Sequence, residues 1–181
     1  MYRSKSNPQI VLRPQDVVVL LRLSLERGSA PTYAVLAEEL KLTASEIHAG
    51  VERAMAARLV RKDAAGKPAV LLESLRLFVA HGLRYCFPVT RGEMTRGVPT
   101  SYAAPPMLAQ VVQPNEAPPV WPHKTGKVRG FAFYPLYPTV PEAAIANPAL
   151  YELLVLVDAI RGGSLRERAL AIAELDKRWS A

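Results

Sequence analysis

Cysteine is almost absent from this chain. Cys86 is the one cysteine among 181 residues, so no disulfide can form within the chain. Structural disulfides are rare in the reducing cytoplasm, and their absence fits that compartment. Cys86 stands between two aromatic residues, and we expect its thiol to be buried and unreactive. Half of the residues are apolar, which is enough for a packed core. Together with the low cysteine content, this predicts a cytoplasmic protein that is held together by such a core.

Long apolar runs are also missing. No stretch approaches the roughly 18 uninterrupted apolar residues that a membrane-spanning helix needs. The first 12 residues include basic side chains but lack the apolar segment of a secretion signal. We therefore expect neither a membrane partner nor export.

Patterns that carry catalytic chemistry are absent as well. The three histidines, His48, His81 and His123, have no cysteine, histidine or acidic neighbour at metal-ligand spacing. Gly92 and Gly97 are not followed by the lysine and hydroxyl residue of a phosphate-binding loop, and no serine-based nucleophile motif is present. We predict that the chain is not an enzyme and that it uses neither a metal nor another cofactor.

The charge balance is strongly basic. The formal net charge is +7 and the isoelectric point about 9.8, which favours an anionic partner such as nucleic acid without requiring one. The basic excess precedes residue 133, because acidic and basic residues nearly balance after that point.

The most informative stretch runs from residue 32 to residue 72. Apolar side chains recur at helical spacing over residues 33–40 and again over residues 44–58, with a short break between them. Thr43 precedes the second helix and Glu46 follows three residues later, which is the capping-box pattern. We therefore predict two consecutive helices joined by a tight turn.

A further helix and a β-hairpin are predicted on either side of this pair. Pro14 suits the first turn of a helix that extends to about Arg27. After the pair, short strand-like runs at residues 60–62 and 69–72 flank the turn-rich sequence Asp63–Pro68. A strand, a glycine-bearing tip and a second strand directly after a helix indicate the wing of a winged helix-turn-helix.

Residues 12–72 resemble the winged helix-turn-helix domains of bacterial transcription regulators of the multiple-antibiotic-resistance-regulator (MarR) type. The resemblance rests on the string TYAVLAEELKLTASEIHAGVERAMAARLVRKDAAGKP and covers about a third of the chain. It implies that one helix braces the DNA backbone while the next places its N-terminal half in a major groove. The implied function is a dimeric, sequence-specific, double-stranded DNA-binding transcription regulator.

The resemblance also implies which residues face DNA. The groove-facing positions of helix 44–58 would be Ala44, Ser45, His48, Ala49, Glu52 and Arg53. At the hairpin, Arg61, Lys62 and Lys67 would contact phosphates or the neighbouring minor groove. The alternative for the arginines is a solvated basic face. Glu52 opposes phosphate binding unless it accepts a hydrogen bond from cytosine.

The predicted fold is mainly α-helical with a small β-wing, in three parts. Residues 10–83 form the winged helix-turn-helix domain, whose last helix spans residues 72–83. Residues 84–141 hold eleven of the 16 prolines, so we predict an irregular but ordered segment. Residues 142–181 form a helical hairpin with two capping patterns, Asn147-Pro148 and Ser164 with Glu167.

Arginine–glycine pairs stand out in the proline-rich segment. Arg91, Arg96 and Arg129 each precede a glycine, and these arginines could clamp phosphates or pair with acidic residues of a partner. A structural loop is the alternative. The second functional hypothesis is therefore a winged-helix protein-interaction module, such as an antitoxin or scaffold, that binds a protein partner through these arginines.

A homodimer is predicted to pair through the C-terminal helices. Leu153, Leu154 and Val157 would then be partly uncovered within one chain. Ordinary burial in the core of a single chain is the alternative.

Overall fold

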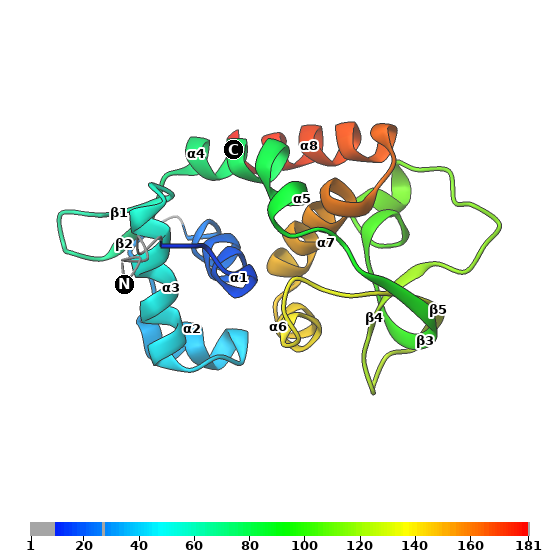
Figure 1. Ribbon diagram of the computed structural model, residues 1–181, viewed down its shortest axis with the longest axis horizontal. Coiled ribbons are helices and arrows are strands. Elements are labelled where there is room, and N and C mark those ends of the chain that lie inside the picture. The colour runs from blue at the N-terminus through cyan, green and yellow to red at the C-terminus, as the bar shows by residue number, and fades with distance from the viewer. Residues whose placement is uncertain (1–9, 27, 181) are drawn as a thin grey trace, which may run out of the picture.

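The computed structural model describes residues 10–26 and 28–180, and it is mainly helical with a small sheet and a C-terminal pair of helices (Figure 1). The residues predicted as an extended N-terminal arm lie largely outside the described ranges. The first part of the chain contains three helices and two short strands. Their bounds are α1 (Pro14–Leu23), α2 (Tyr33–Leu40), α3 (Ala44–Ala56), β1 (Val60–Lys62) and β2 (Pro68–Val70).

Local capping explains where these helices begin and end. Thr43 Oγ1 accepts from the Glu46 backbone at 3.2 Å, and the Glu46 carboxylate accepts from the Thr43 backbone at 2.8 Å, which confirms the predicted capping box. Helix α1 begins at Pro14 as predicted but ends at Leu23. The Ser24 hydroxyl donates to the Leu21 carbonyl at 2.7 Å and competes with continuation of the helix.

Strands β1 and β2 form the predicted antiparallel hairpin. Val60 lies opposite Val70, and Lys62 lies opposite Pro68. The tip is closed by Asp63, whose carboxylate accepts from the backbone of Ala65 and of Lys67, both at 2.8 Å. This Asx-type turn keeps the tip compact and places the Lys67 side chain beside it.

The fourth predicted helix is longer than expected. It consists of α4 (Leu72–Leu77), a π-helical stretch η1 (Phe78–Gly82) and α5 (Leu83–Cys86). Leu75, Val79 and Leu83 bury its inner face. The prediction that Cys86 is buried is wrong, because the residue lies exposed at the end of this helix.

The prediction of an irregular segment over residues 84–141 is wrong in part. Three strands within it form a closed sheet, β3 (Arg91–Pro99), β4 (Pro119–Pro122) and β5 (Val128–Phe133). The long connection between β3 and β4 contains two short 3-10 helices, Ser101–Ala103 and Met107–Ala109. Strand β3 pairs antiparallel with both others, and β4 pairs parallel with β5. Pro99, Pro119 and Pro122 stand at the strand ends, where a missing N–H costs little, and the other prolines of the segment lie outside the strands.

Glycines allow this small sheet to close. A Cβ on Gly97 would lie 2.0 Å from the Trp121 carbonyl oxygen, and one on Gly130 would lie 2.0 Å from the Pro118 carbonyl oxygen. Any other residue would therefore push the strands apart. In the pairs Arg96-Gly97 and Arg129-Gly130, the glycine lies against a neighbouring backbone and the arginine is exposed.

The C-terminal part is helical, with one helix more than predicted. Helices α7 (Pro148–Gly162) and α8 (Leu165–Ser180) form the predicted pair, and both predicted caps are present. The additional helix, α6 (Val140–Ala146), packs against α7 and α2. Its start lies inside the segment that was predicted to be irregular.

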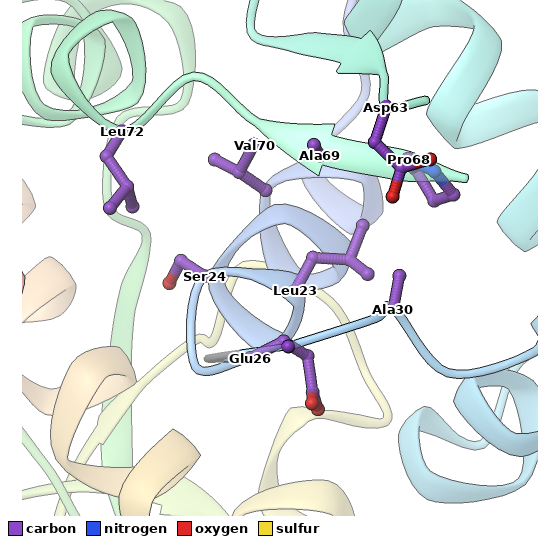
Figure 2. A pocket seen from close by; sticks show the side chains of 10 residues that line it. Leu23, Ser24, Glu26, Ala30, Asp63, Pro68, Ala69, Val70 and Leu72 are labelled. Carbon is purple, nitrogen blue, oxygen red and sulfur yellow. The ribbon is translucent and has the colours of Figure 1, made fainter. Parts of the chain in front are cut away.

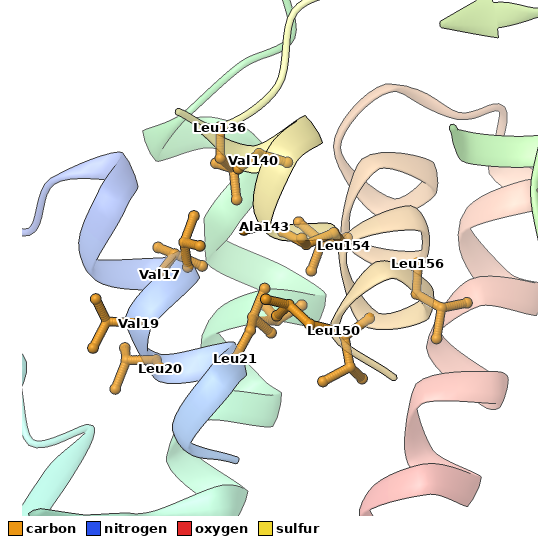
Figure 3. Close-up of a cluster of buried hydrophobic side chains, with 14 of the residues drawn as sticks. Val17, Val19, Leu20, Leu21, Leu136, Val140, Ala143, Leu150, Leu154 and Leu156 are labelled. Carbon is orange, nitrogen blue, oxygen red and sulfur yellow. The ribbon is translucent and has the colours of Figure 1, made fainter. Parts of the chain in front are cut away.

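One core joins the N-terminal helices to the C-terminal ones. Figure 3 shows α1 side chains such as Val17 and Leu21 facing Val140 of α6 and Leu150 and Leu154 of α7. Burial of this apolar surface is the main stabilising contribution to the fold.

The core also uses the residues predicted for a dimer face. Leu153 and Leu154 are 1% and 2% exposed within one chain, and Val157 is 0% exposed. The prediction that they are partly uncovered is therefore wrong. They belong to the interior of a single chain because α1, α6 and α8 surround α7.

A buried polar cluster fastens the sheet to α7. The Asp158 carboxylate accepts from Trp121 Nε1 at 2.6 Å, Arg161 Nη1 at 2.7 Å and Thr100 Oγ1 at 2.9 Å. Burial raises the pKa of Asp158, and the Arg161 charge and the other two donors oppose that rise. Nearby, the Tyr151 hydroxyl donates to the Pro99 carbonyl at 2.6 Å. Burial raises the pKa of Tyr151 to about 12.

Candidate nucleic-acid interface

The outer face of α3 is open. Helix α1 packs on its inner face through Ile47, Val51 and Ala54, which are all buried. In Figure 1, α3 and the hairpin lie on the left-hand side of the molecule, with α1 packed between α3 and the C-terminal helices. Among residues 10–26 and 28–180, no other helix or strand covers this edge, so it can approach a large partner.

Most of the predicted groove-facing residues lie on that open face. Ser45, His48 and Glu52 are exposed, and Ala49 is half-buried. The His48 ring packs edge-on against Tyr33 of α2, with ring centroids 5.7 Å apart. This contact positions the imidazole while leaving it accessible. The face thus presents a hydroxyl and an imidazole as hydrogen-bonding groups, together with one carboxylate.

Arg53 is placed differently from the prediction. Its Nε and Nη2 both donate to the Asp16 carboxylate of α1 at 2.7 Å, and Asp16 is 1% exposed. The hydrogen bonds to Asp16 raise the pKa of Arg53 further. The guanidinium is therefore committed to holding α1 against α3, and we do not include Arg53 among residues available to DNA.

Exposed cations gather on the hairpin beside α3. Arg61, Lys62 and Lys67 are all exposed. Lys67 Nζ also lies 3.4 Å from the Ala30 carbonyl oxygen, a long contact that leaves most of its donor capacity free. Arg58, for which nucleic-acid contact and a solvated basic face were both left open, is exposed in the turn between α3 and β1.

The acidic residue at the start of α3 is occupied by the helix itself. The backbone hydrogen bond from Thr43, followed by the bond from its hydroxyl, lowers the pKa of Glu46. A carboxylate bound in this way offsets the positive end of the helix dipole. Glu46 is therefore a capping residue and does not present a free carboxylate to an approaching phosphate.

A shallow cavity of about 140 Å³ adjoins the hairpin, between β2 and the end of α1 (Figure 2). Glu26 and Asp63 are the charged side chains that line it among residues 10–26 and 28–180. Glu26 is paired with Arg22, and Asp63 closes the hairpin tip. We assign this cavity no ligand.

The three arginines of the Arg-Gly pairs do not converge on one point. Arg91 Nη2 donates to the Gly162 carbonyl at 2.8 Å, and its guanidinium lies over the Phe133 ring at 5.6 Å. That arginine joins the sheet to the end of α7. Arg96 and Arg129 instead lie opposite each other on β3 and β5 and are exposed.

No group of three or more potential metal ligands occurs among residues 10–26 and 28–180. Within the same ranges, every helix is too short or too polar to cross a membrane.

Comparison with protein-family models, with curated proteins and with solved structures gave no match. The functional assignment therefore depends on the geometry of the chain alone.

Proposed function

We propose that helices α1–α3 and the β1–β2 hairpin form a winged helix-turn-helix, and that the protein is a transcription regulator that binds double-stranded DNA. The observation that carries this proposal is an open, well-capped helix, α3, next to a hairpin with three exposed cations. A major groove accepts a helix of this kind, and the flanking phosphates attract the hairpin.

The two parts of this surface have different tasks in the proposal. Arg61, Lys62 and Lys67 bind phosphates, which contributes affinity without selecting a sequence. Ser45 and His48 are the donors on α3 that can reach base edges, and Glu52 can accept from the amino group of cytosine. With so few base-reading groups, we expect modest selectivity over a strongly salt-dependent background.

The test is duplex binding by fluorescence anisotropy across a salt series. One probe is the DNA upstream of the gene, and the other is a random duplex of the same length. We expect the protein to bind the upstream DNA more tightly than the random duplex. The double variant Lys62→Gln with Lys67→Gln should weaken binding to both duplexes. Each lost phosphate contact lowers the salt slope by about 1.

The variant Ser45→Ala with His48→Ala is the matched test of base reading. It should reduce the preference for upstream DNA while the salt slope stays the same, because no phosphate contact is removed. Absence of duplex binding at low salt, or binding that the hairpin substitutions leave unchanged, contradicts the proposal.

A homodimer stays a prediction without an assigned face. Leu153, Leu154 and Val157, which were proposed for the dimer face, are core residues of a single chain. The DNA-binding proposal therefore rests on the α3 of one chain and does not depend on a dimer. A protein partner at the exposed arginines, as for an antitoxin, likewise stays a prediction.

A further inference from the structure

The outward face of β3 and β5 combines cations with large apolar groups. In the strand register, Arg96 lies directly opposite Arg129, and Met94 lies opposite Phe131. Alternate residues on a strand point to the same side, so these four side chains share one face. All four are exposed, and Met94 and Phe131 are 41% and 46% exposed.

The two arginines have no counter-charge in the part of the chain that the structure describes. Neither Arg96 nor Arg129 forms an ion pair or a side-chain hydrogen bond with a residue in ranges 10–26 and 28–180. Like charges directly opposite each other on a sheet are destabilising. An anion bound between them would remove that repulsion.

Further cations lie beside this pair. The loop between β4 and β5 carries Lys124 and Lys127, both exposed, and its Gly126 packs tightly against Gly97 on β3. Since Gly97 follows Arg96, the loop lysines extend the same positive surface. Between residues 91 and 133 the chain has five lysines and arginines but two acidic residues.

The acidic groups near this face do not neutralise it. Glu93 is exposed on β3, at the β-bulge that separates it from the Arg96 pairing. Glu142 of α6 lies 3.8 Å from His123 Nε2, on the side of β4. Glu116 lines a pocket with Phe131. Among the described residues, none of these three carboxylates forms an ion pair with Arg96 or Arg129.

We propose that the β3–β5 face, defined by Met94, Arg96, Arg129 and Phe131, binds single-stranded nucleic acid. Arginines that track phosphates and an exposed aromatic ring on which bases stack are the two components of such sites. An extended peptide is less suited, because each of the three strands pairs with the other two and the closed sheet offers no full edge for strand addition.

This site is separate from the α3 interface. In Figure 1, β3 and β5 lie at the right-hand end of the molecule and the β1–β2 hairpin lies at the left-hand end. The inference therefore does not rest on the proposed function, and either site can fail independently of the other.

The experiment measures binding of labelled oligo-dT and oligo-U strands of about 15 nucleotides, a length within the range of known single-strand sites. Two double variants of the full chain are compared with the wild type, Arg96→Gln with Arg129→Gln and Lys62→Gln with Lys67→Gln. Each removes two positive charges. We expect the first to weaken strand binding by at least about tenfold and to lower the salt slope by about 1.4.

The second variant should leave strand binding within about twofold while it weakens duplex binding. Equal loss of strand binding in both variants would mean a general charge effect and would overturn the proposal. Failure of the wild type to bind either strand at low salt would also overturn it, and binding of poly-glutamate in that case would assign the face to an acidic protein.

A second pair of variants tests base stacking independently of charge. Phe131→Tyr keeps an aromatic ring and should retain strand binding, whereas Phe131→Leu should weaken it by about tenfold. Both replacements retain a large side chain at a half-exposed position, and thermal unfolding confirms that each variant is folded. Equal strand binding by the two folded variants would contradict a stacking role for this ring.

Discussion

At the scale of single residues, Arg53 shows how one partner changes the role of a side chain. A guanidinium on the DNA-facing helix of a winged helix would ordinarily be assigned to phosphate. Here Asp16, which is almost completely buried, accepts both of its donated hydrogen bonds. A buried carboxylate requires such a partner, so the ion pair is a structural requirement of the α1–α3 contact.

We predict that Arg53→Ala lowers the free energy of unfolding by about 3 kcal/mol, because it leaves the Asp16 carboxylate buried and unpaired. Chemical denaturation measures this loss. Lys62→Ala is the control, since its side chain is exposed and should change stability by less than about 0.5 kcal/mol. A destabilised Arg53→Ala that binds duplex DNA with wild-type affinity under folding conditions would confirm the structural role. Wild-type stability combined with weaker DNA binding would instead restore Arg53 to the interface.

At the scale of elements, the closed sheet explains the arginine–glycine pairs of the sequence. The glycines stand where β3 and β5 approach a neighbouring backbone most closely, and the adjacent arginines are then forced outward by the alternation of the strand. One local pattern therefore serves packing on the inner side and presents charge on the outer side.

We predict that Gly97→Ala destabilises the protein by about 2 kcal/mol or more, because a Cβ there would meet the Trp121 carbonyl oxygen at 2.0 Å. Gly28→Ala is the matched control. A Cβ at Gly28 meets no atom within 4 Å, and its φ lies outside the left-handed region. Thermal unfolding compares the two variants. Similar melting temperatures for both would show that the sheet tolerates the methyl group.

At the scale of the whole molecule, two basic surfaces lie at opposite ends of one continuous core. The α3 edge and the β3–β5 face are connected through α1 and α7, which pack directly against each other. We therefore propose that the two surfaces bind different nucleic acids or separate parts of one.

The Asp158 cluster is the polar attachment between the sheet and this core. We predict that Asp158→Asn lowers the free energy of unfolding by about 3–5 kcal/mol, because Arg161 would keep its charge without a buried counter-charge. Thr100→Val removes one neutral donor from the same carboxylate and should cost about 1–3 kcal/mol. Urea unfolding measures both. A smaller loss for Asp158→Asn than for Thr100→Val would contradict the role assigned to the ion pair.

Much of the helical structure could be predicted from the sequence. The bounds of α2 and the starts of α1, α3 and α7 depend on prolines, capping residues and apolar spacing, which act within a few residues. The hairpin also follows from a local turn. The exposed positions on α3 could also be predicted, because helical periodicity places Ser45 and His48 on a different face from the buried Ile47.

The sequence by itself therefore determined the local helices, their caps and the basic hairpin. Only the tertiary structure decided the closed sheet, since β3 pairs with strands that follow it after long connections and no local pattern encodes that pairing. It also decided that Arg53 is bound to Asp16, that α7 is buried within one chain, and that Arg96 meets Arg129. In each case the deciding contact joins residues far apart in sequence, and its energy depends on burial that exists only after the chain has folded.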